Sequence, residues 1–178
     1  MKKKEDRRVT MTKRLLKEAL IEMLKETDIY QISIRELCEQ ADVNRSTFYK
    51  YYGNQFDLMA DVENDHLRFF AESIEKYEGN SAKAFEMICS YMEEHAESVR
   101  VIVNNNIDAE LPKKLLSMNI VYEAAGRKYG EQMSEDQKEY LYNFLTYGAF
   151  RIIYIWLNKE KREPAEEFAK TLARLLMP

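Results

Sequence analysis

The sequence predicts an all-α fold, and two observations carry this prediction. Only 5 Gly and 3 Pro occur among 178 residues, which leaves too few turn residues for a sheet of many strands. Apolar residues also recur at spacings of three and four, the period of one helix face. We expect about nine helices in two domains, a three-helix domain at residues 1–55 and a larger helical domain at residues 56–178.

The first predicted helix is about 15 residues long and begins near Thr10 or Thr12. Its apolar residues form adjacent pairs that recur every four positions, namely Leu15, Leu16, Ala19, Leu20, Met23 and Leu24. Such pairs lie on one stripe of a helix, so this face is expected in the core. The helix is expected to end near Thr27.

Two shorter helices are predicted next, because each has a recognisable N-terminal cap. The Ser33 hydroxyl can accept from the amide of Glu36 while the Glu36 carboxylate reaches back, which is a capping box. This helix is expected at residues 33–41. Asn44 suits the N-cap of the following helix, expected at residues 45–52.

The rest of the chain is expected to be helical as well. A break near Glu94 is expected inside one of these segments, Ser134 is a predicted N-cap, and Pro164 suits a first helical position. The predicted helices cover residues 54–77, 82–103, 111–129, 135–157 and 164–177.

Charge is distributed unevenly along the chain. The net charge of −4 is the sum of +3 over residues 1–55 and −7 over residues 56–178. A basic head can collect phosphates while an acidic body repels nucleic acid. Ordinary surface variation explains the charges equally well, so charge alone does not decide the partner.

Other features of the sequence exclude several classes of protein. Cys38 and Cys89 stand in apolar helical segments without CxxC spacing and are expected to be reduced core thiols. The first residues are charged, and no apolar run approaches the ~18 residues of a membrane span. We therefore expect a cytoplasmic protein without a membrane partner, a metal or a cofactor.

The helices at 33–41 and 45–52 have the layout of a helix-turn-helix. On the second helix Phe48 and Tyr52, four residues apart, are expected to face inward. The side chains left outside are hydrogen-bond donors, namely Arg45, Ser46, Tyr49 and Lys50. Donors on a short helix suit base edges and phosphates in the major groove of double-stranded DNA, and Arg45 suits two hydrogen bonds to a guanine.

Residues 41–52, which read Ala-Asp-Val-Asn-Arg-Ser-Thr-Phe-Tyr-Lys-Tyr-Tyr, and residues 54–58, Asn-Gln-Phe-Asp-Leu, resemble the signature of TetR-type regulators. Asp42 and Ser46 replace the commoner glycines, and Tyr52 replaces Phe. Farther on, residues 148–157 and 164–167 resemble the branch of regulators of dihydroxyacetone kinase genes.

The resemblance implies roles for individual residues. Ser33 and Arg35 are expected to contact the DNA backbone or a base, and Tyr51 a phosphate. Gln55 stands where the family usually has Lys, so it keeps a hydrogen bond to phosphate but lacks the charge. The predicted DNA-binding set is Ser33, Arg35, Asn44, Arg45, Ser46, Thr47, Tyr49, Lys50, Tyr51 and Gln55. A basic segment before them is expected to form either an arm on DNA or a disordered tail: Lys2, Lys3, Lys4, Arg7 and Arg8.

Two amphipathic helices near the C-terminus are expected to supply half of an intersubunit four-helix bundle, as the resemblance also implies. The predicted interface consists of Leu141, Leu145, Gly148, Ile152, Ile155, Trp156, Phe168, Leu172, Leu175 and Leu176. Stripes of this kind are often core instead. A homodimer doubles the DNA-reading helix, so a roughly palindromic operator is expected.

The resemblance also implies a small-molecule effector in the second domain, whose binding releases a repressor from DNA. Polar groups on otherwise apolar helices are candidates to line its pocket: Tyr91, Tyr122, Tyr147 and Arg151. Their polar atoms can equally reach solvent or a backbone carbonyl. The sequence fixes neither the effector, nor the operator, nor whether the output is repression or activation.

Two alternatives belong to other classes. Glu63 and His66 form one ExxH pair on a helix, but a di-iron bundle needs two, so an enzyme is not expected. A helical adaptor that works through protein contacts is the second, since the body is acidic and Gln55 lacks a charge. DNA binding is preferred, because an adaptor gives Arg45, Tyr49 and Lys50 no role.

Overall fold

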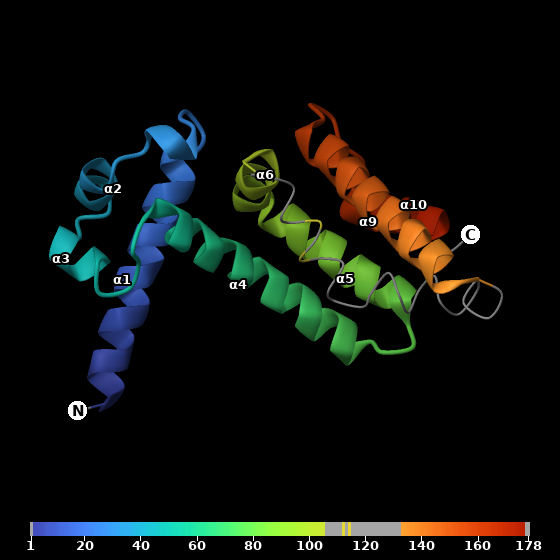
Figure 1. Ribbon diagram of the computed structural model, residues 1–178, viewed down its shortest axis with the longest axis horizontal. Helices are drawn as coiled ribbons and strands as arrows, with labels where there is room; N and C mark the ends of the chain where they lie inside the picture. The colour runs from blue at the N-terminus through green and yellow to red at the C-terminus, as the bar shows by residue number, and fades with distance from the viewer. Residues whose placement is uncertain (1, 106–111, 113, 115–132, 177–178) are drawn as a thin grey trace. The chain divides into compact units, whose positions relative to one another are not determined.

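The computed structural model describes residues 2–105, 112, 114 and 133–176, and all regular secondary structure within them is helical (Figure 1). The all-α prediction is confirmed. The described elements are α1 (Lys2–Met23), the 3-10 helix η1 (Ile29–Gln31), α2 (Ile34–Gln40), α3 (Arg45–Phe48), α4 (Gln55–Lys76), α5 (Ser81–Glu94), α6 (Ala96–Asn104), α9 (Glu135–Asn158) and α10 (Ala165–Leu176). The helix predicted at 111–129 lies outside the described residues. No helix in the described part is long and apolar enough to cross a membrane.

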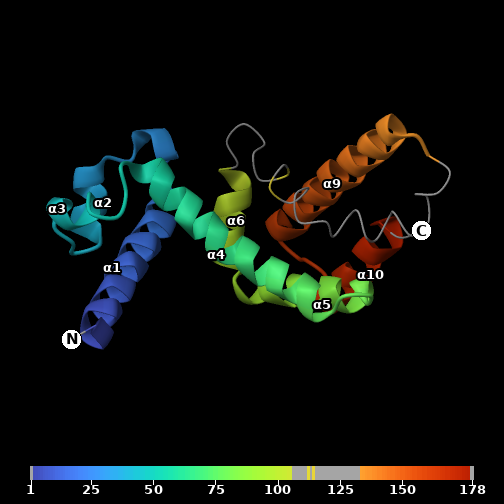
Figure 2. The ribbon, with the colours of Figure 1, turned by 60° about the horizontal axis from the view of Figure 1, so that its bottom comes forward.

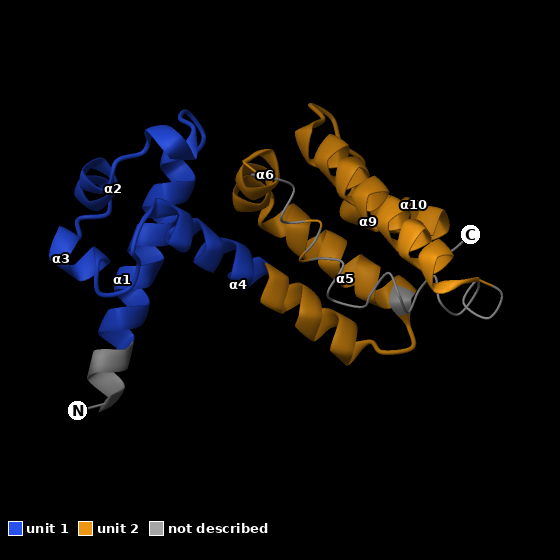
Figure 3. Ribbon diagram, in the orientation of Figure 1, with its two compact units in different colours: residues 1–66 blue, residues 67–178 orange. Residues whose placement is uncertain are grey.

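The chain forms two compact units, Met1–His66 and Leu67–Pro178 (Figure 3). The sequence placed the boundary after residue 55, at the start of α4. In the structure the first half of α4 belongs to unit 1 because Leu58, Met59 and Val62 are buried. The same helix then continues into unit 2.

Unit 1 is built on α1, and α2 and α3 lie to one side of it in both Figure 1 and Figure 2. The predicted stripe of α1 is in the core, with Leu16 and Leu20 fully buried. The prediction that this helix begins near Thr10 was wrong, because α1 starts at Lys2. The residues before Thr10 include neither Gly nor Pro and are mostly charged straight-chain residues that favour a helix, so nothing stops it there.

The turn between α2 and α3 is a Schellman motif. The amide of Val43 donates to the carbonyl of Cys38 (2.9 Å), and the amide of Asp42 donates to that of Glu39 (3.3 Å). This closure places Asp42 in the left-handed region, with φ 51°. Glycine adopts this conformation without strain and aspartate tolerates it, so the turn keeps its shape without the glycine common in the family.

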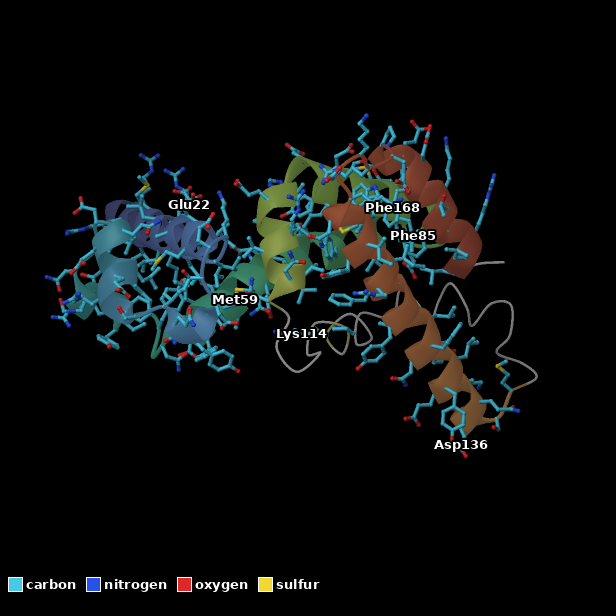
Figure 4. The ribbon with its side chains drawn as sticks, turned by 90° about the horizontal axis from the view of Figure 1, so that it is seen from above. Glu22, Met59, Phe85, Lys114, Asp136 and Phe168 are labelled. Carbon is cyan, nitrogen blue, oxygen red and sulfur yellow. The ribbon has the colours of Figure 1, made fainter. Side chains whose placement is uncertain are left out.

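Unit 2 has its core between α5, α9 and α10. The rings of Trp156 and Phe168 stack with centroids 4.4 Å apart, and both side chains are buried. Phe85 of α5 and Phe168 of α10, labelled in Figure 4, belong to the same core. The predicted break near Glu94 is confirmed, since α5 ends there and α6 begins at Ala96.

Two sets of polar contacts tie α6 to the end of α9. The Arg100 guanidinium donates from Nε to the carbonyl of Leu157 (3.0 Å). The amides of Asn104 and Asn158 donate to each other, at 3.2 and 3.0 Å. These bonds hold the last turn of α6 in register with α9.

The strain at Asp42 gives a stability prediction. Asp42→Gly should leave the free energy of unfolding unchanged or raise it by up to about 1 kcal/mol, because glycine adopts the left-handed conformation without steric strain. Asp42→Val should lower it by about 1–2 kcal/mol, because a β-branched residue is strained there. Urea unfolding of the three proteins measures both, and equal stability of Asp42→Val and wild type would contradict the assigned turn.

Candidate nucleic-acid interface

The segment after Asn44 has a buried side and an exposed side. Phe48 and Tyr52 are buried, as the sequence predicted. The α-helix proper ends at Phe48, four residues before the predicted end, and turns follow. Helical hydrogen bonding nevertheless continues, since the amide of Tyr52 donates to the carbonyl of Phe48 (3.1 Å).

The exposed side carries the donors expected from the sequence. Arg45 and Lys50 are exposed, and Tyr49 exposes 59% of its surface. Among the described residues neither cation pairs with a carboxylate. The three side chains are therefore available to an anionic partner.

Asn44 and Ser46 form hydrogen bonds with each other within this segment. The amide and the hydroxyl of Ser46 both donate to Asn44 Oδ1, each at 2.8 Å. This N-cap, predicted from the sequence, satisfies an amide that the short helix leaves unpaired. Thr47 is half-buried between this cap and Phe48.

The helix α2 packs against α3 and begins with a cap of its own. Ser33 and Glu36 form the predicted capping box, in which the amide of Glu36 donates to Ser33 Oγ (3.2 Å) and the Ser33 hydroxyl donates to Glu36 (2.6 Å). Arg35 pairs with Glu39 at 3.6 Å, and both are well exposed. An exposed pair of this kind is weak, so Arg35 can exchange its carboxylate for a phosphate.

A shallow cleft of about 420 Å³ lies between α2 and α3. It is lined by Arg35, Cys38, Glu39, Asp42, Val43, Asn44 and Arg45. The Cys38 thiol is buried, and burial raises its pKa. The two arginines thus lie at one concave surface of unit 1.

The N-terminus of α4 supplies further groups. Asn54 caps it, because its Oδ1 accepts from the amides of Phe56 (2.9 Å) and Asp57 (3.0 Å). Gln55 is half-buried and its amide lies 3.5 Å from the carbonyl of Ile29. Tyr51 is half-buried beside Tyr52, with ring centroids 6.5 Å apart.

A polar network that the sequence did not predict connects α1, α4 and the segment after α3. The Tyr52 hydroxyl donates to Asp61 Oδ2 (2.6 Å), which also accepts from Lys13 (3.3 Å) and lies 3.2 Å from Lys17 Nζ. Lys17 further reaches Asp65 (2.6 Å). One signal was present, because Lys13 and Lys17, like Asp61 and Asp65, are four residues apart on a helix.

The network shifts the titration of its members. Burial raises the pKa of the Tyr52 phenol, and its bond to Asp61 raises that pKa further. Burial alone raises the pKa of Asp61, but hydrogen bonds from Tyr52 and Lys17 outweigh it, so this pKa is lowered. Asp61 is therefore a carboxylate, and Tyr52 a neutral donor, at neutral pH.

The residues predicted for a dimer interface fall into two groups. Five of them are buried inside unit 2 itself: Leu145, Trp156, Phe168, Leu172 and Leu176. Leu141, Gly148 and Ile152 are half-buried, while Ile155 and Leu175 are exposed. The five buried side chains are core, so an interface on this face has to use the others.

The sequence analysis missed two residues with large exposed rings on α9. Tyr140 exposes 71% and Phe144 75% of their surface. They share a stripe with Tyr147, Arg151 and Ile155, which are also exposed. The spacing of four, three, four and four residues was the available signal, but it overlaps the spacing of the core stripe.

Three of the four residues predicted to line a ligand pocket are described, and they lie on two helices, α5 and α9. Tyr147 and Arg151 are on the exposed stripe of α9. Tyr91 is half-buried, stacked on Phe69 of α4 at 3.9 Å and 4.3 Å from the ring of His95. Tyr122 lies outside the described residues.

The metal alternative concerned Glu63 and His66 of α4, whose side chains are half-buried. Within the described residues no group of three or more His, Cys, Asp or Glu is placed to hold a metal ion.

Sequence comparison matches residues 79–178 to a family described as transcriptional regulator C-terminal region. A curated relative, the HTH-type transcriptional regulator YxbF of Bacillus subtilis, is 42% identical over 50 residues, 28% of this chain and 13% of YxbF. The HTH-type dhaKLM operon transcriptional activator DhaS of Lactococcus lactis is 26% identical over 68 residues, 38% of this chain and 36% of DhaS. The chain thus matches well under half of each relative's length.

Solved structures share the fold. A TetR transcriptional regulator from Streptococcus agalactiae superposes with a TM-score of 0.72 at 19% identity, over 100% of both chains. FadR from Bacillus subtilis, in complex with stearoyl-CoA, superposes with a TM-score of 0.66 at 16% identity, over 92% of this chain and 97% of FadR.

The capped helix-turn-helix and the helical unit that follows it define a helix-turn-helix transcriptional regulator rather than an enzyme. The chain belongs to the TetR family, as its motif at residues 41–58 indicated.

The lowered pKa of Asp61 predicts how stability depends on pH. A carboxylate with a lowered pKa in the folded state stabilises it above the unfolded pKa, near 4, and loses this effect as the pH falls through the folded value. Wild type should therefore exceed Asp61→Asn in stability by about 1 kcal/mol at pH 7, and the gap should close below pH ~4. Thermal melts from pH 7 to pH 3 test this, and a gap independent of pH would contradict it.

Proposed function

We propose that the chain is a homodimeric repressor that binds a palindromic operator through α3 and the turns after it. The observation that supports this most is the exposure of Arg45, Tyr49 and Lys50 opposite two buried rings. The neighbouring Arg35, together with Tyr51 and Gln55, offers further groups to phosphates. Such a regulator works where DNA is, in the cytoplasm of a bacterial cell.

Each exposed donor has a distinct expected task. Arg45 is the first residue of α3, and the N-terminal residues of a recognition helix are those that reach base edges. Its guanidinium suits O6 and N7 of guanine. Lys50 lies beyond the helix end, where a point charge suits a phosphate and carries no sequence information.

The exposed stripe of α9 supports a second copy of this chain as its occupant. It consists of Tyr140, Phe144, Tyr147, Arg151 and Ile155, and Leu175 of α10 is exposed as well. Several large rings in one row are unusual on a monomer surface. The family assembles as dimers, and two copies of one stripe can pack against each other about a two-fold axis.

A small effector that lowers DNA affinity is part of the proposal. FadR, with the same fold, is solved with stearoyl-CoA, which supports a ligand for unit 2 of this chain. Thr146 supports a polar contact to a ligand inside unit 2, because it is 2% exposed and its hydroxyl has no hydrogen-bond partner among the residues that the structure describes. A buried hydroxyl without a partner is costly, and a ligand group can satisfy it.

The experiment that decides between DNA binding and a helical adaptor is selection from a random duplex library. A palindromic motif with half-sites about one or two helical turns apart supports both DNA recognition through α3 and assembly as a dimer. A library that yields no enriched motif would exclude the proposal. A reporter carrying the selected operator then shows whether the bound protein lowers or raises transcription. Activation is the competing outcome, because the relative DhaS is named as a transcriptional activator.

Arg45 and Lys50 should respond differently to removal. Arg45→Ala should weaken operator binding by about 1–3 kcal/mol and abolish preference at one base pair, while weak binding to other DNA remains. Lys50→Ala should weaken all sequences alike and reduce the salt slope by about 1. Fluorescence anisotropy at several salt concentrations measures both, with Arg174→Ala on α10 as a control. Equal operator affinity of wild type and Arg45→Ala would reject the assignment.

The dimer proposal is tested on α9. Phe144→Glu places a charge in the middle of the exposed stripe, so it should convert the dimer into a monomer and weaken binding to the full operator at least tenfold. Binding to a single half-site should be unchanged. Analytical ultracentrifugation measures the mass, and Ala71→Glu on the exposed side of α4 is the control. A dimeric Phe144→Glu protein would show that this stripe is not the interface.

A further inference from the structure

We propose that Tyr52 is a positioning residue for DNA recognition, whose hydroxyl, held by Asp61, fixes the segment that carries Tyr49 and Lys50. This inference rests on the proposed function, because it requires that α3 and the turns after it bind DNA. It assigns the accuracy of DNA recognition to the hydrogen bond between Tyr52 and Asp61, which lies behind the proposed DNA-binding surface. Tyr52 itself is buried and is not available to DNA.

The position of this segment is set at its two ends. Phe48 is fully buried and closes the first end. Between it and Tyr52 the α-helix has ended and the chain continues as turns through Tyr51. The amides of Lys50, Tyr51 and Tyr52 still donate to the carbonyls of Thr47 and Phe48, so the turns hold their local shape. The hydroxyl of Tyr52 ties the far end of these turns to α4, so this anchor influences where the exposed side chains of Tyr49 and Lys50 are held.

The anchor at Tyr52 involves three elements. Its hydroxyl donates to Asp61 of α4 at 2.6 Å, a short bond to a carboxylate. The ammonium of Lys13, from α1, lies 3.3 Å from the same Asp61 oxygen and 5.2 Å from the centroid of the Tyr52 ring. Lys17 of α1 lies 3.2 Å from that oxygen and donates to the backbone carbonyl of Asp61 (3.2 Å).

The hydroxyl and the ring of Tyr52 have separable tasks. The ring fills core volume beside Phe48, with centroids 5.6 Å apart. Phenylalanine preserves that packing, and Asp61 keeps Lys13 and Lys17 as partners when the hydroxyl is removed. Loss of the hydroxyl should therefore leave the fold in place and loosen the segment after Phe48. A looser segment occupies the arrangement that binds the operator less often. The apparent affinity for the operator falls in proportion.

The test compares wild type with Tyr52→Phe in the full-length protein. Affinity for the selected operator should fall about tenfold in Tyr52→Phe. Affinity for unrelated duplex should fall less, because non-specific binding does not need one fixed arrangement of the segment. The slope of affinity against salt should stay unchanged, because the phosphate-binding cations are all present. Tyr30→Phe removes an exposed hydroxyl from η1 in the same unit and should change none of these values.

Asp61 variants make the assignment independent of one substitution. Asp61→Asn retains an oxygen that accepts from Tyr52 and should keep more operator affinity than Asp61→Ala. In the Asp61→Ala background, Tyr52→Phe should cost nothing further, because both changes remove the same bond. Additive losses would overturn the proposal.

The remaining outcomes also discriminate. Wild-type operator affinity in Tyr52→Phe would overturn the positioning role. Parallel losses of melting temperature, operator binding and non-specific binding would assign Tyr52 to the core alone. Failure of wild type itself to select an operator would instead refute the proposed function, and that result is obtained before any variant is made.

Discussion

Between Asn44 and Gly53 the structure buries just two side chains, Phe48 and Tyr52, and this constraint decides what the segment presents. Two rings four residues apart fix one side of a helical segment toward the core. Of the side chains between and before them, Thr47 and Tyr51 are half-buried and the others are exposed. Arg45, Tyr49 and Lys50 are outward because of where the rings are, and the proposed DNA recognition depends on that division.

The same logic explains α9, where one helix carries two apolar faces. Leu145 and Trp156 point into unit 2, and Phe144 and Ile155 point out. The two members of each pair are adjacent in sequence and so about 100° apart around the helix. The spacing of apolar residues predicts a broad apolar surface on α9. It does not show which face is core and which is exposed, because apolar residues recur every three or four positions on both faces.

What could be predicted from the sequence was what depends on neighbouring residues. The capping box at Ser33, the N-caps at Asn44 and Ser134 and the break near Glu94 were all predictable, since each depends on side chains within three or four positions. The bond of Lys13 to Asp61 joins residues 48 apart, and no local rule pairs them. Which residues of the predicted interface are core and which are exposed could not be predicted for the same reason, because Trp156 is covered by Phe168 on another helix.

The helix α4 imposes a requirement on any effector. In unit 1 it supplies Asp61 to the anchor of Tyr52, and in unit 2 it supplies Phe69 to the stack with Tyr91. It is the described helix whose residues belong to both units. A ligand in unit 2 changes DNA affinity only if it binds two arrangements of the protein differently. For the effector proposed above, α4 is the described helix through which a change at Phe69 can reach Asp61, the carboxylate that holds the segment after Phe48.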